Sequence, residues 1–339
     1  MSFDLAHADI VPTVSVLDAS TQDHSFGDRQ FPGLHNDLNW IWAMVDTENG
    51  RRYELIRCFG KSGTFDFTVH ECHPDIWAYP RHVRVPGEED LYWGPVIWFD
   101  SGSPTLFPAN MTMAAKHRLA LTLDPAGYVW KEDDVVDVVL TPLPGNVTVI
   151  EVPGRPDPVA YTSSGCSVTG TIEGSRVVGG YGGLDRMYCL PEISCQTSKM
   201  ANLEHYWFVW RAEFEDGSWE TGNCMLGAGG YATATCRRAG EAPVIATNGD
   251  VEAKVSWIDQ DGASQPHLAR LAFGGRTFEF TGTHNAAACA AALGIAWLHG
   301  AVQEAGGRTP VRSWATMEVI QRNWTNEPDG GLQRAAPRS

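Results

Sequence analysis

The sequence predicts an all-β protein built from two antiparallel β-barrel or β-sandwich domains, with one helix late in the chain. The chain of 339 residues carries 13 Trp, 9 Tyr and 13 Phe beside 35 Gly and 20 Pro, which is typical of many short strands joined by tight turns. Apolar residues also recur with a period of two along most of the sequence, as strands with one buried face require. The length suffices for one large all-β unit or two ordinary domains.

The first hairpin candidate lies near the start of the chain. Residues 39–45 place Trp40 and Trp42 on one strand face, and residues 51–59 form the returning strand. Asn49-Gly50 between them is a strong signal for a tight hairpin turn. The segment therefore predicts a strand, a turn and a strand.

A second hairpin candidate repeats this device. Residues 205–214 are rich in aromatic side chains, Asp216-Gly217 supplies the turn, and residues 218–226 return. Many strands at such short spacing favour antiparallel barrels or sandwiches. The other strand candidates are 96–99, 117–123, 135–140, 147–152, 167–172, 251–258, 268–273, 277–280 and 314–322.

A break in composition divides the chain near its middle. Pro153, Gly154, Pro156 and Pro158 crowd into residues 152–158, and such a cluster is typical of a linker. We therefore predict an N-terminal domain over residues 1–152 and a C-terminal domain over residues 159–327. A ligand site is expected between the two domains or inside the mouth of one.

The predicted helix covers residues 286–302, which are rich in Ala. Polar residues 283–285 precede it, and Gly306-Gly307 and Pro310 follow, as start and stop signals do. The stretch is too short and too weakly apolar for a confident membrane span. We expect a buried or docked helix and no stable insertion into a membrane.

The charge balance excludes one class of partner. Lys and Arg number 25 against 41 Asp and Glu, which gives a net charge of −16, and such a surface repels phosphate backbones and anionic lipid heads. Nucleic acid is therefore not an expected partner, whereas a small apolar substrate suits the aromatic composition. The first twenty residues lack a basic start and an apolar core, so a cytoplasmic protein is expected. The sequence leaves a homo-oligomer open.

Neither a metal site nor a cofactor is predicted. Eight Cys are scattered without C-x-x-C spacing, and residues 70–73 (HECH) stand alone, so we expect reduced core cysteines rather than a zinc site. The Gly-rich run 179–183 lacks the following Lys and Ser or Thr of a phosphate-binding loop. A Gly-x-Ser-x-Gly elbow is also missing from the sequence. Cofactor-independent chemistry without a serine nucleophile is expected.

Two segments resemble a known family. Residues 35–42 (HNDLNWIW) run into 46–53 (DTENGRRY), and residues 167–172 (SVTGTI) precede 180–188 (GYGGLDRMY). This resembles the lipocalin-like family of carotenoid 1,2-hydratases (hydroxyneurosporene synthases), with tocopherol-cyclase-like and Diels–Alderase relatives. The resemblance implies two lipocalin-like β domains, an apolar cavity and an isoprenoid or polyketide ligand. It also implies that Asp185 is the proton donor, followed by Arg186 where the hydratases have His.

Asp185 is the first candidate for a catalytic residue on its own chemistry too. In an extended segment Tyr181 and Asp185 share one face, while Arg186 and Tyr188 point the other way. If the first face lines an apolar pocket, desolvation raises the carboxyl pKa and lets the group act as an acid near neutrality. A turn aspartate paired with an arginine is the alternative.

Two further titratable residues are candidates for catalysis. Glu318 lies on one predicted strand face with Trp314 and Arg322, where a surface ion pair with Arg322 is the alternative. His35 precedes the first aromatic strand and offers a base or a hydrogen bond, or simply belongs to a loop. Residues 205–213 alternate too, but the sequence does not say which face is core. The candidates for substrate binding are Trp40, Trp42, Tyr181, Arg186, Tyr188, Trp207, Arg211 and Trp314.

These residues support three functions. The first is a cofactor-independent hydratase or dehydratase (a lyase or isomerase) in which a buried acid protonates a terpenoid or similar apolar substrate, and indole faces stabilise the carbocation. The second is a cyclase or pericyclase that folds a polyene or polyketide. The third is a non-catalytic carrier of a hydrophobic ligand.

Overall fold

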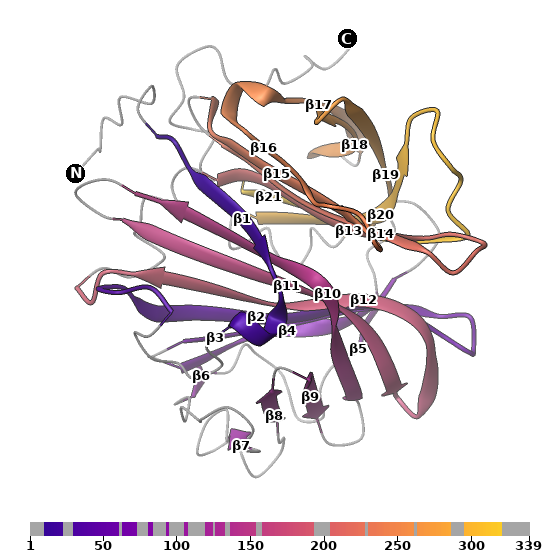
Figure 1. The fold of residues 1–339 in the computed structure, drawn as a ribbon. Coiled ribbons are helices and arrows are strands. Elements are labelled where there is room, and N and C mark those ends of the chain that lie inside the picture. Colours follow the sequence, from indigo (N-terminus) through magenta and orange to yellow (C-terminus); the bar gives the residue numbers. More distant parts are fainter. Residues whose placement is uncertain are drawn as a thin grey trace.

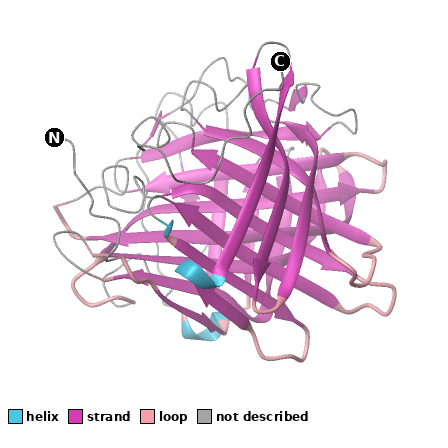
Figure 2. Cartoon of the chain, turned by 90° about the horizontal axis from the view of Figure 1, so that it is seen from above, coloured by secondary structure: helices cyan, strands magenta, loops and turns pink. Residues whose placement is uncertain are grey.

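The structure of the chain is a computed structural model in which strands dominate (Figures 1 and 2). The described residues are 10–22, 30–60, 63–72, 81–83, 93–94, 105–107, 119–124, 126–132, 136–153, 158–192, 204–227, 230–260, 263–285 and 295–320. They form two antiparallel sheets, and their helices are two 3-10 turns, η2 (Ala19–Thr21) and η5 (Asn248–Asp250). The predicted all-β class is confirmed.

The first sheet has 12 strands in the order β5-β4-β3-β2-β12-β11-β10-β9-β8-β7, with β1 beside β10 and β6 beside β4. Neighbours in the chain are mostly neighbours in the sheet, and the β2–β12 pair joins the two runs. The strands are β1 (Thr13–Leu17), β2 (His35–Thr47), β3 (Arg52–Gly60), β4 (Gly63–Cys72), β5 (Arg81–Val83), β6 (Trp93–Gly94), β7 (Thr105–Phe107), β8 (Leu119–Asp124), β9 (Gly127–Glu132), β10 (Val136–Val152), β11 (Val159–Ile172) and β12 (Ser175–Cys189).

The second sheet has nine strands in the order β16-β15-β14-β13-β21-β20-β19-β18-β17. Because the last strand pairs with the first, the sheet curls into a nearly closed barrel that lies above the first sheet in Figure 1. The strands are β13 (Glu204–Glu213), β14 (Trp219–Gly227), β15 (Ala232–Arg238), β16 (Val244–Thr247), β17 (Val251–Gln260), β18 (Ala263–Phe273), β19 (Arg276–Asn285), β20 (Ile295–Glu304) and β21 (Arg312–Ile320).

Both predicted hairpins are present. The β2–β3 turn places Gly50 at φ 79, and the β13–β14 turn places Gly217 at φ 78, a backbone region that glycine adopts without steric cost. Most other predicted strands also lie within observed ones, although 135–140 and 147–152 form a single strand, β10. The predicted strand 96–99 lies outside the described residues.

The predicted late helix is wrong in the part that is described. Residues 295–302 belong to β20, which pairs with β19 on one side and β21 on the other. Leu298 and Val302 are buried in the core of the second sheet. Ladder hydrogen bonds and burial on both sides outweigh the helix propensity of the Ala-rich sequence. Residues 286–294 lie outside the described part.

The change of sheet does not coincide with the predicted boundary between domains 1–152 and 159–327. Val152 and Val159 are direct partners, so the Pro-rich segment between them joins neighbouring strands of the first sheet. The change to the second sheet falls between Cys189 and Glu204. Proline and glycine are frequent in the turns between paired strands.

The buried apolar side chains of the described residues form three large clusters, and a smaller fourth one includes Phe31 and Tyr188. One core lies on the far face of the first sheet and includes Tyr128 and Trp130. Another lies inside the curl of the second sheet and includes Trp210. A third cluster draws residues from both sheets, among them Trp42 and Trp207, and so lies between them. We call this third cluster the intersheet layer.

A network of charged side chains lies at one end of the second sheet's interior. Glu220 is buried and accepts hydrogen bonds from Arg238 (2.6 Å) and Arg276. Both guanidinium groups also contact Glu304. Each carboxylate therefore faces two arginines, which compensates the burial of the charges.

Four buried cysteines, Cys166, Cys189, Cys224 and Cys236, are free, as predicted, and the other four side chains lie outside the described part. Among the described residues, neither 3-10 turn approaches the length and hydrophobicity that a transmembrane helix needs.

Candidate functional site

Asp185 lies in the middle of β12, one of the central strands of the first sheet. Its direct cross-strand partners are Ser163 on β11 and Trp40 on β2. Side chains of such partners point to the same face of a sheet, so the three project together. The face also carries Trp42 and Tyr181, which belong to the intersheet layer. Because Asp185 stands in mid-strand, the alternative of a turn aspartate is wrong.

The intersheet layer brings tryptophans from both sheets together. The rings of Trp42 and Trp207 lie 5.8 Å apart in an edge-to-face arrangement, and Trp42 makes a similar contact with Tyr181 at 5.3 Å. Edge-to-face geometry is favoured by the quadrupoles of the rings. Trp40 is half-buried at the border of this layer. Of the predicted substrate-binding residues, Trp40, Trp42 and Tyr181 therefore share the face that carries Asp185, and Trp207 packs against this face from the second sheet.

The carboxyl group of Asp185 is shielded from solvent, with the residue only 4% exposed. Burial raises its pKa from 3.8 to about 6, and polar hydrogens of Ser163, Trp42 and Tyr161 nearby oppose this rise. Neither Oδ1 of Asp185 nor Nε1 of Trp42 makes a hydrogen bond of good geometry to a described residue. This is the direction that desolvation of a carboxyl group gives, and a pKa near 6 leaves about one-tenth of the groups protonated at pH 7.

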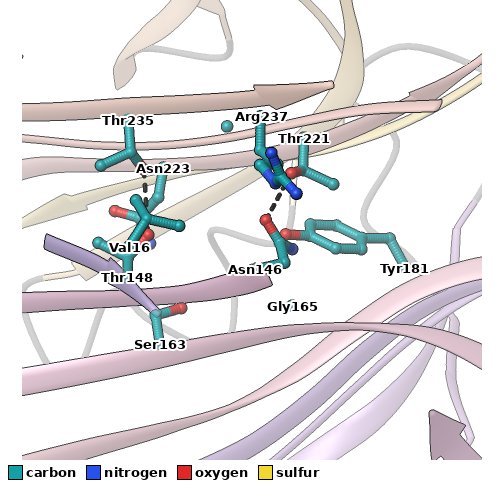
Figure 3. Close-up of a pocket in the computed structure, with 11 residues that line it drawn as sticks. Val16, Asn146, Thr148, Ser163, Gly165, Tyr181, Thr221, Asn223, Thr235 and Arg237 are labelled. Carbon is teal, nitrogen blue, oxygen red and sulfur yellow. Dashed lines mark hydrogen bonds between the residues drawn. The ribbon is translucent and has the colours of Figure 1, made fainter. Parts of the chain in front are cut away.

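A polar pocket lies beside Ser163, the cross-strand partner of Asp185 (Figure 3). Ser163, the partner of Asp185, lines it from the first sheet, and Asn223 lines it from the second. Its volume is about 10 Å³, close to the smallest space that holds one water molecule. The family resemblance implies an apolar cavity, whereas this pocket is small and polar. The remaining lining residues are Val16, Asn146, Thr148, Gly165, Tyr181, Thr221, Gly222, Thr235 and Arg237.

Direct hydrogen bonds join the two sheets around this pocket. The hydroxyls of Thr148 and Thr235 lie 3.0 Å apart, and the Thr221 hydroxyl donates to Oδ1 of Asn146 at 2.7 Å (Figure 3). Gly165, on the strand next to that of Asn146 in the first sheet, leaves room for the Asn146 amide, because a Cβ there would lie 2.0 Å from Nδ2 of Asn146. A ligand larger than water would therefore fit this pocket only if the side chains that line it moved.

Arg211 and Trp314 hold the sheets together at the same level. Nη1 of Arg211 donates to the carbonyl of Gly180 at 3.0 Å, and Nε1 of Trp314 donates to Oδ2 of Asp46 at 3.0 Å. Burial lowers the pKa of Arg211, and the contact with Glu213 opposes this. Both predicted binding residues thus make structural contacts across the layer.

The second face of β12 carries the other two predicted binding residues. Arg186 and Tyr188 are buried on the side away from Asp185, where Tyr188 packs edge-to-face on Phe31 at 4.8 Å. Burial raises the pKa of Tyr128, a residue in the core of the first sheet, and the positive charge of Arg186 opposes this rise. The structure does not bring Arg186 and Tyr188 to Asp185.

Glu318 is half-buried on β21 and stands directly opposite Trp207. It therefore lies on the strand face that the second sheet turns toward the intersheet layer. Its predicted alternative partner, Arg322, lies outside the described residues. The sequence left open which face of β13 is core. Phe208 lies in the core of the second sheet, whereas Trp207 lies in the intersheet layer.

His35 lies at the start of β2, far along the strand from the position opposite Asp185. It is the cross-strand partner of Cys189. The ligand atoms of His35, Asp37 and Cys189 all lie within 4.8 Å of one another. Nitrogen, oxygen and sulfur donors of this kind suit zinc, although closed structural sites use four. The sequence did not reveal this group, because Cys189 is distant in the chain. The HECH motif at 70–73 lies outside the described side chains.

Several residues of the layer were missed by sequence reasoning. Ser163 and Asn223 are single polar residues in strands, and only the strand register shows that they face the site. Glu54 and His299 likewise form a buried contact between the two sheets. Burial, and then the charge of Arg52, lowers the pKa of His299 to about 3, so the ring is neutral at pH 7.

Comparisons with known proteins give no family assignment. No protein-family model and no curated protein sequence matches the chain. Among solved structures, a candidate AttH from Nitrosomonas europaea has 15% identity and a TM-score of 0.47, covering 84% of this chain and 93% of its own. Kievitone hydratase from Nectria haematococca has 9% identity and a TM-score of 0.38, with coverages of 91% and 98%.

A third similar structure is that of CghA with Sch210972, at 10% identity, a TM-score of 0.36, and coverages of 84% and 88%. Because all three likenesses lie below a TM-score of 0.5, the activities of these proteins are not transferred to this chain. The resemblance of its motifs to the hydratase family remains a prediction, and the proposals below rest on the residues of the intersheet layer.

Proposed function

We propose that the protein is a cofactor-independent hydratase or dehydratase that acts on an apolar alkene or alcohol of the terpenoid kind. The observation that carries this proposal is Asp185, a carboxyl group buried among aromatic side chains with a pKa raised to about 6. A general acid works best when its pKa lies near the working pH. The acid form of Asp185 is half-populated at pH 6.

Hydration would begin with proton transfer from Asp185 to one carbon of the double bond. A C–H bond forms, the O–H bond of the acid breaks, and the electron pair stays on the carboxylate. The neighbouring carbon becomes a cation, which water attacks to form the C–O bond. The proton that water releases returns to Asp185, so the acid is regenerated. Dehydration follows the same steps in reverse.

The tryptophans of the layer would stabilise the cationic intermediate. Trp42 and Trp207 lie in contact beside Asp185, and Trp40 is its cross-strand neighbour. A cation over an indole face gains about 0.5–2 kcal/mol. The ionised carboxylate also faces the cation in a site of low dielectric constant, where charge pairing is strong. Acid and aromatic faces therefore serve one intermediate.

The packing sets a condition on this function. Hydrogen bonds and aromatic packing fill the space between the sheets. A terpenoid substrate would enter only if the two faces move apart, and the binding energy of its apolar surface would have to offset the hydrogen bonds that break and the rings that separate. Closure of the layer around the substrate would then exclude bulk water from the cation.

The test is Asp185→Asn, assayed against a panel of terpene alcohols, alkenes and polyketides in D₂O. The wild-type enzyme is expected to place deuterium on carbon in the hydration direction, whereas the variant should bind the same ligand with no turnover. Asp250→Asn, at an exposed position, is the matched control and should keep full activity. Full activity of Asp185→Asn would remove Asp185 from the mechanism and favour a pericyclic reaction.

A further inference from the structure

Ser163 and Asn223 line a polar pocket to which the proposed acid catalysis by Asp185 gives no role. Hydration consumes one water molecule per turnover, and that water must reach a cation that bulk solvent does not. A place for a single ordered water next to Asp185 would meet this need. The pocket has the volume, the lining and the position for it.

We propose that this pocket binds the one water molecule that hydration consumes and dehydration releases. The inference deepens the proposed function and rests on it for the role of the water. The existence of the binding site rests only on the residues that line the pocket, so the two can be tested apart.

Asn223 lines the pocket with an amide group that can both donate and accept hydrogen bonds. Its side chain comes from β14 and is buried, with 6% of the residue exposed. Neither its Nδ2 nor its Oδ1 has a hydrogen-bond partner among the described residues. Burying an amide with no partner destabilises the folded state, and a water in the pocket would bond to both its donor and its acceptor.

The size and the polarity of the pocket suit one water molecule. About 10 Å³ suits one water and excludes an organic ligand. Ser163 faces Asn223 across the pocket from the other sheet, and Nε of Arg237, which lines it too, has no partner among the described residues (Figure 3). A bound water would thus reach the three or so hydrogen bonds that buried waters usually make.

Ser163 connects the pocket to the proposed acid, Asp185. Ser163 both lines the pocket and lies beside the carboxyl group of Asp185. When the water oxygen attacks the cation, its proton passes to Oγ of Ser163 while the Ser163 hydroxyl proton passes to the Asp185 carboxylate. One C–O bond and one O–H bond of the acid form, one O–H bond of water breaks, and the serine ends unchanged. A hydroxyl is suited to this relay because it donates and accepts at once.

The test of the site needs no substrate. In the wild-type protein, nuclear Overhauser effects should connect the Asn223 side-chain amide protons to a long-lived water, and ¹⁷O relaxation dispersion should count that water. Asn223→Leu removes both polar atoms at similar volume and should lower the count by one. Thr233→Val is the matched control, because it removes one buried hydroxyl at a position outside the lining of the pocket. An unchanged count in Asn223→Leu would overturn the site.

The test of the relay uses turnover. Ser163→Ala should lower the hydration rate about 100-fold, the lower range for loss of a proton-transfer group, while ligand affinity changes less than twofold. Full activity in Ser163→Ala would overturn the relay even if the water is present. Failure of the proposed function would look different, because Asp185→Asn would then retain turnover whatever the water count shows.

Discussion

Replacing Asp185 by Asn should stabilise the folded protein at neutral pH. The ordinary pKa of the group is 3.8, and burial raises it to about 6 in the folded chain. Each pH unit between these values corresponds to about 1.4 kcal/mol, so an ionised Asp185 costs the folded state about 3 kcal/mol above pH 6. Asparagine keeps the shape of the side chain without the charge, and the variant avoids this cost.

The gain has a definite pH dependence. Between pH 4 and pH 6 the unfolded chain ionises at this position while the folded chain keeps its proton, so the stability of the wild-type protein falls as pH rises. Well below pH 3.8 both states are protonated and the Asp185 contribution is fully present. The advantage of Asp185→Asn should therefore be only about 0.5 kcal/mol at pH 4, grow through pH 5 and reach about 3 kcal/mol at pH 8.

Urea unfolding at these pH values measures the difference directly. Asp250→Asn, at an exposed position, is the control and should differ from the wild-type protein by less than about 0.5 kcal/mol at each pH. If Asp185→Asn is no more stable than the wild-type protein at pH 8, or if its advantage is the same at pH 4, the carboxyl group is not desolvated and the reasoning fails.

Three other variants test the packing of the two sheets. A disulfide between Thr148→Cys and Thr235→Cys, whose hydroxyls lie 3.0 Å apart, should abolish turnover by locking the sheets, with recovery on reduction; full activity of the oxidised form would show that the sheets need not separate. Gly165→Ala should cost about 1–3 kcal/mol in urea unfolding, because the new methyl meets two side chains within 2.5 Å, whereas Gly249→Ala, with open space, should be near neutral. Glu220→Gln should lower the unfolding free energy by about 3 kcal/mol, because it leaves two arginines without their buried carboxylate; an unchanged melting temperature would contradict this.

Patterns that extend over a few residues predicted most of the strands. Alternation and the Asn49-Gly50 and Asp216-Gly217 turns placed the two aromatic hairpins correctly, because both signals act over a few residues. The helix over 286–302 failed for the opposite reason. The preference of Ala for helices is weak, and β20 is set by pairing with strands that the local sequence does not show.

The candidate site was predictable only in part. The alternation of β12 separated Asp185 from Arg186 and Tyr188, and it therefore indicated that the acid and these two residues face opposite ways. Ser163 and Asn223 gave no signal, since their importance comes from the register of β11 and from the contact between sheets. A single polar residue in a strand gives no sign of a site until its neighbours across the sheet are known.

The most direct test of the account is the pKa of Asp185 itself. In protein labelled with ¹³C at aspartate carboxyl carbons, the resonance that disappears in Asp185→Asn can be followed from pH 3 to pH 9. A midpoint near pH 6 is the result that a desolvated acid between the sheets requires. A midpoint near pH 4 would show a solvated carboxylate, and the acid-catalysed hydration proposed for this protein would lose its proton donor.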